Sequence, residues 1–492
     1  MAGGVGNDTY VVDSVGDAVA ENAGEGADTI LSTVSLSLNT AALANVEHLT
    51  IAGAATNATG NALNNILTGS ASDNVLDGGA GNDTMIGGDG NDTYFVTSGD
   101  LVFEGNTATS GVDTVRTSAS NYLLDNNVEN LVMTSAGGQG AGGTDLANTI
   151  TGNENVSIID GFGGNDSILG NGGNDLLFGG LGDDTLDGGE GNDVLDGDHD
   201  SGLFTEQNPN GPDGRDVLRG GNGNDTLVGG LSDDLLSGGN GDDTYILDGS
   251  VATVVEVSST GGTHDVIQSS VSYTFDGFLD SGIEELQLFG TAEIDATGDD
   301  RGNTLIGNDS ANILEGLLGN DLLQGQGGND LLSGGQGDDT LVGGAGTDQF
   351  EGGIGNDSLS GGLNADIYYA FDNFGADVIS DIDSTAINPV TQENMDELHF
   401  LSASYESLWF KQVNNDLEIS VVGTTNKATV QGWFASTNNR VEVIFDDVGG
   451  HALSALNVAN LVSAMSGFSP QPITDTSNQQ LVNARNAAWA TL

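Results

Sequence analysis

Residues 188–196 read GGEGNDVLD, and this nine-residue pattern recurs in phase through much of the chain. Glycine opens each unit, aspartate takes the sixth position and an apolar residue takes the eighth, here Gly188, Asp193 and Leu195. The pattern runs in blocks that open at Gly60, Gly143, Gly211 and Gly298. Because self-similarity at a fixed period indicates a repeat architecture, this pattern determines the expected fold.

Each unit reads as a turn followed by a short strand. The first five positions are rich in Gly and Asn, which reach positive φ and form tight turns that expose their carbonyls. The eighth position alternates with polar neighbours, as in Thr185–Asp187, which is typical of a strand. The apolar residues expected inside are Met85, Ile168, Leu177, Leu186, Leu195, Leu227, Leu341, Phe350 and Leu359. Two units would close one coil, so the sequence predicts an all-β fold, a parallel β-roll or right-handed β-solenoid with coils roughly 4.8 Å apart.

Stacked coils would place the sixth-position aspartates in a ladder. Two carboxylates about 5 Å apart repel by roughly 3 kcal/mol at an effective dielectric constant near 20. Ca²⁺ accepts six to eight oxygen ligands from carboxylates and carbonyls, whereas Mg²⁺ demands octahedral geometry and retains its water. A single aspartate would be interpreted as a solvated turn residue, but the phased set predicts several calcium sites.

The candidate calcium ligands are aspartates of the sixth position and glycines of the same turns. The aspartates are Asp83, Asp92, Asp166, Asp175, Asp184, Asp193, Asp216, Asp225, Asp234, Asp243, Asp321, Asp330, Asp339, Asp348, Asp357 and Asp366. The glycines are Gly161, Gly163, Gly170, Gly172, Gly179, Gly188, Gly220, Gly229, Gly316, Gly325, Gly334, Gly343 and Gly352. Where the sixth position is an amide, we expect weak binding or none, at Asn65, Asn74, Asn148, Asn303 and Asn312. Ser157 is a further exception.

The composition agrees with a chain that needs cations to fold. There are 73 acidic and 8 basic residues, a formal charge of −65, and self-repulsion on this scale opposes compaction. Nucleic acid is an improbable partner, because phosphate binding needs clustered Lys and Arg. A hydrophobic fraction of 37% argues against disorder, and the lack of cysteine excludes disulfides and thiolate ligands. We expect no transmembrane helix and no cleavable N-terminal secretory signal, and a start within a repeat suggests a piece of a longer protein.

In this pattern the chain resembles the RTX family, whose haemolysin-type nonapeptide is G-G-x-G-x-D-x-U-x. The resemblance implies a secreted protein with many calcium ions as its cofactors. The segment from Asp416 to Phe434 resembles the calcium-binding-related domain that closes many RTX proteins. The resemblance also implies that the C-terminal residues are an uncleaved type I secretion signal, with the matching exporter as a partner.

Three longer segments between the blocks resemble one another. Each contains a motif of the type Asn7–Tyr10, then one like Ala27–Ile30 and one like Val46–Leu49. Their strands alternate, as in Ser269–Phe275, and we interpret them as wider β-coils of the same solenoid. The expected organisation is linking coils at 1–59, 97–142 and 250–297, and β-rolls at 60–96, 143–249 and 298–369. A capping domain follows at 370–450, and a helical tail with the secretion signal at 451–492.

The cap is expected to be small and rich in β-structure. Residues 417–422 and 441–445 have strand-like patterns, and Leu453–Met465 has the apolar period of a helix. After the prolines at 470 and 472 comes a helix-prone tail, which ends with residues 486–492.

An irregular insertion at 198–210 interrupts the second block. Asp196, Asp198 and Asp200 have the spacing of an EF-hand loop, but Ser201 and Gln207 stand where that loop needs Gly and a bidentate Glu. A surface loop is the preferred interpretation, and an extra calcium site is the alternative.

Catalytic signatures are missing, so the chain is not expected to be an enzyme. The five histidines form no H-E-x-x-H motif, and there is no G-x-S-x-G motif or Gly-rich phosphate loop. The expected function is a secreted calcium-binding protein that folds on meeting extracellular Ca²⁺. Two alternatives are a structural or adhesive module of a larger cell-surface protein, and the carrier portion of a secreted enzyme with its catalytic domain elsewhere.

Overall fold

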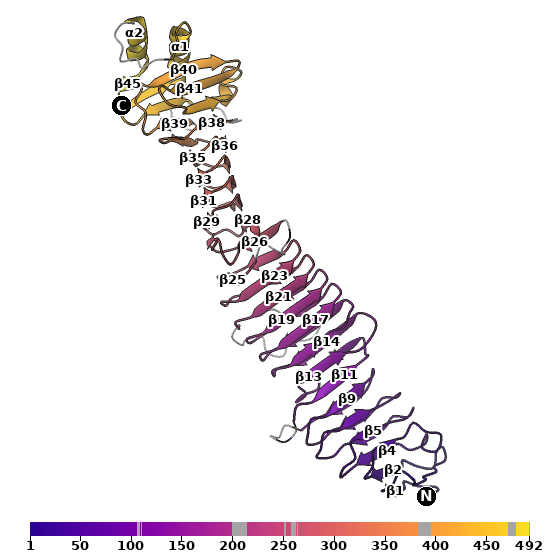
Figure 1. Cartoon of the computed structure of the whole chain (residues 1–492). Coiled ribbons are helices and arrows are strands. Elements are labelled where there is room, and N and C mark those ends of the chain that lie inside the picture. The colour runs from indigo at the N-terminus through magenta and orange to yellow at the C-terminus, as the bar shows by residue number, and fades with distance from the viewer. Residues whose placement is uncertain are drawn as a thin grey trace. The chain divides into compact units, whose positions relative to one another are not determined.

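The computed structural model describes residues 1–105, 109, 111–198, 214–249, 252–256, 262, 264–381, 395–470 and 479–491. The chain divides into two compact units, of which the first is Met1–Val255 with Thr260–Gly262 and the second is Glu256–Ser259 with Thr263–Leu492. Each unit contains stacked coils of short parallel strands, and the second ends in an antiparallel cap with two helices (Figure 1). Among the described residues, no helix is long and apolar enough to cross a membrane.

Three sets of strands run along the first unit. One sheet has the order β1 (Thr9–Val12), β2 (Thr29–Ser32), β4 (His48–Ile51), β6 (Ile66–Thr68), β8 (Thr84–Ile86) and β10 (Leu101–Phe103). A second contains β3 (Leu36–Ser37), β5 (Asn57–Thr59), β7 (Val75–Asp77), β9 (Thr93–Val96), β11 (Thr114–Thr117), β13 (Asn130–Met133), β15 (Thr149–Thr151), β17 (Ser167–Gly172), β19 (Thr185–Glu190), β21 (Val217–Asn222), β23 (Leu235–Asn240) and β25 (Thr253–Val254). The third set contains β12 (Asn121–Leu123), β14 (Gln139–Thr144), β16 (Ser157–Phe162), β18 (Leu176–Phe178), β20 (Val194–Asp196), β22 (Thr226–Val228) and β24 (Thr244–Leu247).

The second unit has two sets of strands. One contains β26 (Asp265–Ser269), β28 (Ile283–Leu288), β30 (Thr304–Ile306), β32 (Leu322–Gly327), β34 (Thr340–Ala345), β36 (Ser358–Leu363), β38 (Ala376–Ile379), β40 (Leu408–Val413), β41 (Asp416–Val421) and β42 (Lys427–Val430). The other contains β27 (Tyr273–Thr274), β29 (Ala296–Thr297), β31 (Ile313–Leu318), β33 (Leu331–Gln336), β35 (Gln349–Ile354), β37 (Ile367–Ala370), β39 (Glu397–Phe400), β43 (Val443–Asp446), β44 (His451–Ser454) and β45 (Ala490–Thr491). The helices are α1 (Ala455–Met465) and α2 (Gln479–Ala488), with a short 3-10 turn at Thr437–Asn439.

The parallel register confirms that two nonapeptides make one coil. Ile150 pairs with Ile168, and Ile168 pairs with Leu186, so equivalent residues stack every 18 residues. These side chains point inward, and every eighth-position residue named above is at most 3% exposed. The core is thus a narrow column of single apolar side chains, one from each half-coil. The expected parallel β-solenoid with a cap and a short helix is therefore the observed fold.

The linking segments form coils of unequal length. In the regular coils, the backbone N–H of one ladder residue bonds to the carboxylate 18 residues further on. In the segment after β9, the corresponding spacing is 21 residues from Asp92 to Asp113 and 16 residues from Asp113 to Glu129. The alternating stretch expected at 269–275 is not one strand, because β26 ends at Ser269 and β27 begins at Tyr273. The hydroxyl of Ser269 donates to the carbonyl of Val271 at 2.7 Å and thereby stabilises a corner between the two strands.

The cap differs from expectation at the edges of its elements. Residues 451–454 form β44, which pairs with β43 through Ile444 and Leu453, so the helix begins at Ala455 rather than at Leu453. The tail helix ends at Ala488, because Trp489 is buried against Tyr405 and Phe410 at ring-centroid distances of 5.8 and 6.3 Å. Tertiary packing therefore overrides local helix propensity in both places.

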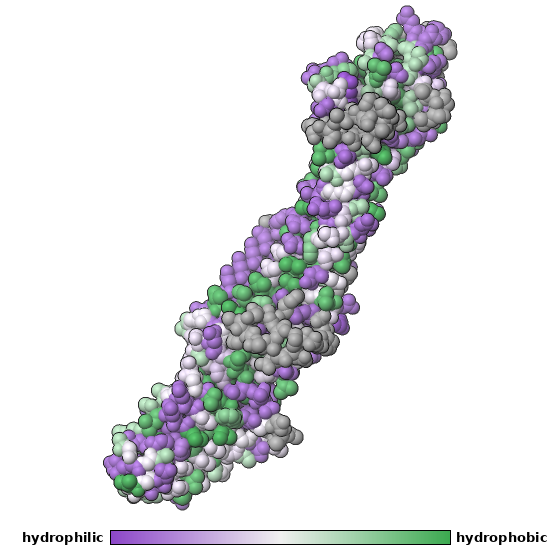
Figure 2. Space-filling view, turned by 180° about the vertical axis from the view of Figure 1, so that it is seen from behind, coloured by the Kyte–Doolittle hydropathy of each residue, from purple (hydrophilic) through white to green (hydrophobic). Residues whose placement is uncertain are grey.

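Short solenoid coils leave part of their apolar surface in water. Seventh-position residues such as Leu176, Val194 and Leu235 point away from the core and are 36–38% exposed. Figure 2 shows such apolar residues in small patches among hydrophilic ones on the face in view. Isolated apolar residues of this kind are normal on protein surfaces and indicate no binding site.

Candidate metal centre

The sixth-position aspartates are buried, and one oxygen of each carboxylate is used by the backbone of the preceding coil. Oδ1 of Asp184 accepts a hydrogen bond of 2.7 Å from the backbone N–H of Asp166, and Oδ1 of Asp339 accepts one of 2.8 Å from Asp321. All sixteen predicted aspartates are at most 3% exposed. The sequence therefore placed these side chains in register, and their inward orientation comes from these hydrogen bonds.

The other carboxylate oxygen, Oδ2, is buried without a hydrogen-bond partner among the described residues. This holds for Asp83, Asp92, Asp166, Asp175, Asp184, Asp193, Asp216, Asp225, Asp234, Asp321, Asp330, Asp339, Asp348 and Asp357. A buried polar atom without a partner costs about 1–3 kcal/mol, and more if it is charged. Because fourteen aspartates repeat this unfavourable burial of Oδ2, we infer that a ligand binds these oxygens.

The first glycine of each unit lies against that oxygen. A Cβ placed on Gly161 or Gly179 would lie less than 3.0 Å from Oδ2 of the aspartate five residues later. The same Cβ would lie 2.5 Å from the carbonyl oxygen of the glycine one coil further on, Gly179 or Gly197. Neither Gly161 nor Gly179 has a positive φ, so glycine is needed here for space rather than for backbone conformation. A carboxylate and a carbonyl thus converge on a space that any side chain would fill.

The predicted glycines divide into two groups by this criterion. Each first-position glycine lies beside Oδ2 of its own aspartate, at Gly161, Gly170, Gly179, Gly188, Gly220, Gly229, Gly316, Gly325, Gly334, Gly343 and Gly352. At the third position, the nearest atoms to a Cβ on Gly163 belong to Leu181 at 3.8 Å, and the nearest to one on Gly172 is Oε2 of Glu154 at 3.3 Å. A role for these two carbonyls as ligands stays a prediction.

Burial raises the pKa of the ladder carboxyls. Desolvation is the main cause, and neighbouring aspartates add to it, while the hydrogen bond from the preceding coil opposes it. The pKa of Asp166 is raised to about 9, that of Asp216 to about 8 and that of Asp184 to about 7. The ionised form is therefore unfavourable at neutral pH unless a cation is close.

A hard divalent cation fits this donor set. Carboxylate and carbonyl oxygens are the ligands of Ca²⁺, which tolerates irregular geometry. The residues that would hold it are Oδ2 of each sixth-position aspartate with carbonyls of the adjoining turns. Bound there, the ion would neutralise the carboxylates and cross-link successive coils.

The amides that replace aspartate at the start of blocks make different contacts. Nδ2 of Asn148 donates to the carbonyl of Val128 at 3.0 Å, and Nδ2 of Asn65 donates to the carbonyl of Glu47 at the same distance. An N–H donor thus satisfies a carbonyl that a cation would otherwise have to approach. This arrangement agrees with the expected weak binding at these positions, which stays a prediction.

The structure adds acidic residues that the sequence argument did not assign. Oδ1 of Asp28 accepts from the backbone N–H of Asp8, and Oδ1 of Asp113 from that of Asp92. Oε2 of Glu129 then accepts from Asp113 at 2.7 Å. Asp28 and Asp113 lie in the motif of the type Ala27–Ile30, and Glu129 lies in the motif of the type Val46–Leu49. The repetition of these motifs in the linking segments was the available signal.

The alternative calcium site at the insertion falls partly outside the described residues, because Asp200, Ser201 and Gln207 are not among them. Of its other members, Asp198 already accepts backbone hydrogen bonds from Gly214 at 3.3 Å and Leu231 at 2.8 Å.

Comparison with known families agrees with this geometry. Residues 59–94, 142–177, 169–200, 211–245, 297–332, 306–341 and 333–368 match the RTX calcium-binding nonapeptide repeat. Residues 416–447, which hold β41 to β43, match the haemolysin-type calcium binding protein related domain. The chain is therefore a calcium-binding β-roll protein with RTX nonapeptide repeats, and it carries the related C-terminal domain.

Proposed function

We propose that this chain is secreted in an unfolded state and folds when it binds extracellular calcium. The observation that supports this most directly is the ladder of sixteen buried aspartates, fourteen of which have one carboxylate oxygen without a hydrogen-bond partner in the described residues. Without cations, a chain with a formal charge of −65 would have to bury these carboxylates against desolvation and mutual repulsion.

Metal binding and folding would therefore be coupled. An ion that binds only the folded state stabilises it by mass action, and affinities near those of extracellular calcium modules would leave the sites empty in a low-calcium cytosol. An unfolded chain can be threaded through an exporter, and we propose a type I system as that partner. Residues 451–492 would carry its signal.

We also propose that this chain is not an enzyme and acts as a calcium-dependent structural element. A β-solenoid whose coils are cross-linked by calcium suits an adhesive or spacing module of a cell-surface protein, or the carrier portion of a secreted enzyme. An activity screen of the 492-residue chain would contradict this proposal by finding reproducible turnover.

A calcium titration tests coupled folding. The full chain, stripped of metal with chelator, should show little β-structure by circular dichroism and should gain it cooperatively as calcium approaches millimolar concentrations. Magnesium at the same concentration is the control and should be far less effective. A chelated sample with the full β-signal would overturn the proposal.

A further inference from the structure

Three clusters of carboxylates combine an aspartate at the end of a nonapeptide turn with acidic residues of the segment that follows it. They are Asp8–Glu21–Asp28, Asp92–Glu104–Asp113 and Asp366–Asp381–Asp396, and in each cluster one oxygen from each residue lies within 4.8 Å of the others. Each begins at an aspartate two residues before a buried tyrosine, namely Tyr10, Tyr94 or Tyr368. The clusters therefore mark one recurring arrangement where a nonapeptide turn meets a longer coil.

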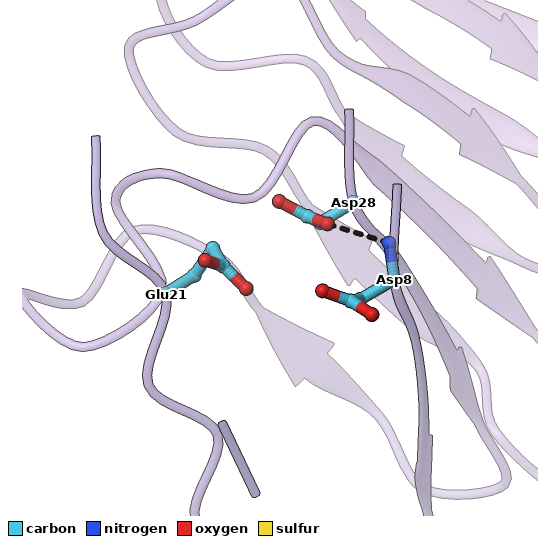
Figure 3. Close-up of side chains that lie close together, drawn as sticks. All are labelled: Asp8, Glu21 and Asp28. Atoms are coloured by element: carbon cyan, nitrogen blue, oxygen red, sulfur yellow. Dashed lines mark hydrogen bonds between the residues drawn. The ribbon is translucent and has the colours of Figure 1, made fainter. Parts of the chain in front are cut away.

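The first cluster brings together residues from two stacked coils and the loop between them. Figure 3 shows the carboxylate of Glu21 pointing from its loop toward those of Asp8 and Asp28. Oδ1 of Asp28 accepts from the backbone N–H of Asp8 at 2.8 Å. Oδ2 of Asp8 and Oδ2 of Asp28 are buried without a partner among the described residues, and Asp28 is 1% exposed. Two of the three carboxylates thus keep an oxygen available inside the cluster.

Glu21 is fixed in this position by the protein. It accepts hydrogen bonds from the hydroxyl of Tyr10 and, at 3.0 Å, from the backbone N–H of Asn22. The hydroxyl of Tyr10 in turn accepts from the backbone N–H of Gly3 at 2.8 Å. A chain of hydrogen bonds therefore holds the carboxyl group of Glu21 opposite two further carboxylates.

The second cluster repeats these contacts. The hydroxyl of Tyr94 donates to Oε1 of Glu104, and Oδ1 of Asp113 accepts from the backbone N–H of Asp92 at 2.7 Å. A Cβ on Gly87 would lie less than 3.0 Å from both Oδ2 of Asp92 and Oε1 of Glu104. Oδ2 of Asp92 and Oδ2 of Asp113 are buried without a partner among the described residues, and these aspartates are 1% and 0% exposed.

We propose that Asp8–Glu21–Asp28 and Asp92–Glu104–Asp113 each bind one calcium ion through three side-chain carboxylates, as a second kind of site. In the nonapeptide turn, the aspartate faces the carbonyl of a glycine one coil further on. In these clusters, the carboxylate of a glutamate from the intervening loop faces the aspartate in place of that glycine carbonyl. Three ionised carboxylates this close repel one another strongly unless a cation lies between them, and affinity for calcium rises with the number of charged ligands. In the second unit, the buried Asp366–Asp381–Asp396 cluster has an aspartate in place of the glutamate, and Oδ2 of Asp381 accepts a hydrogen bond of 3.1 Å from the hydroxyl of Tyr368.

Calcium counting on the full chain tests the proposal. Glu21→Gln combined with Glu104→Gln should lower the number of calcium ions bound at saturation by two, as measured by equilibrium dialysis. Glu293→Gln, the same change at an exposed residue, is the matched control and should keep the wild-type number. A folded double variant with the wild-type number would overturn the proposal and would indicate that a shared proton, rather than an ion, holds the cluster.

Terbium luminescence gives a second measurement that does not alter the carboxylates. Tb³⁺ replaces Ca²⁺ in oxygen sites and emits when a nearby tyrosine is excited, and the hydroxyls of Tyr10 and Tyr94 contact the proposed ligands Glu21 and Glu104. The double variant Tyr10→Phe and Tyr94→Phe should lose a large part of this emission. Unchanged emission would overturn the proposal.

The two proposals fail separately. If the wild-type chain folds without calcium, the proposed function fails whatever the clusters bind. If it folds with calcium but the glutamine variant and the tyrosine variant both behave as wild type, only the second kind of site is excluded.

Discussion

The backbone N–H of Asp166 donates a hydrogen bond of 2.7 Å to Oδ1 of Asp184, one coil further along the chain. This contact orients the Asp184 carboxylate and leaves its Oδ2 buried in the space beside Gly179. The same relation joins Asp175 to Asp193 and Asp330 to Asp348, both at 2.8 Å. Each coil therefore positions the metal-facing oxygen of the next, so sites in one block are expected to fill cooperatively.

The raised pKa values predict that protonation of the buried aspartates at low pH partly stabilises the fold when calcium is absent. An aspartate has a pKa near 3.9 when unfolded, whereas burial raises that of Asp175 to about 7 and that of Asp166 to about 9. The folded state thus binds more protons between these values, and the stability of the calcium-free fold falls as pH rises from about 4 to 9. Circular dichroism in chelator should show more β-structure at pH 4.5 than at pH 8.5. A pH-independent signal would contradict this expectation.

Asp184→Asn should remove one calcium ligand while keeping the hydrogen bond to Asp166, because an amide oxygen still accepts. With calcium at 100 times the dissociation constant of the site, losing one ion costs about 2.7 kcal/mol of folding free energy. The calcium midpoint for folding should rise. Asp187→Asn, a partly exposed residue in the same coil, removes the same charge and should have little effect. Equal behaviour of the two variants would argue against a special role for the sixth position.

Gly161→Ala and Gly163→Ala both reduce backbone freedom in the same turn, but only Gly161→Ala fills the space beside the carboxylate of Asp166. The added methyl on Gly161 would collide with Oδ2 of Asp166, whereas that on Gly163 has its nearest neighbour at 3.8 Å. Overpacking of this kind costs about 1–3 kcal/mol, and the first variant should also lose a calcium ion. The measurements are thermal unfolding in calcium and the ion count. A larger loss of thermal stability or of bound calcium in Gly163→Ala than in Gly161→Ala would contradict the proposed site beside Oδ2 of Asp166.

Asn148→Asp should destabilise the fold at limiting calcium. The substitution removes the N–H that satisfies the carbonyl of Val128 and places a carboxylate against it, at an expected cost of about 1–3 kcal/mol. Asn192→Asp is the control, because the fifth position already holds Asp in other units, as at Asp183. Calcium titrations followed by circular dichroism compare the two variants. A lower calcium midpoint for Asn148→Asp would show that the amide is not needed.

Several features of the fold could be predicted because the repeat leaves few alternatives. A nine-residue period with one inward-facing apolar position per unit places one apolar side chain inside each half-coil, and Leu186 and Leu341 are fully buried as expected. The cap was less predictable. Leu453 has a helical pattern but belongs to β44, since pairing with Ile444 outweighs its local propensity.

The sequence by itself determined the coil and the stacking of Asp175 on Asp193, because a strict nine-residue period repeats the same local geometry. Its acidic composition also predicted that the fold needs a cation. Only the tertiary structure decided which oxygen of each carboxylate remains available, since that depends on a backbone N–H one coil away. It also decided that Glu21 and Glu104, which fit no period, lie beside the ladder, because the lengths of their loops place them there and no repeating pattern records those lengths.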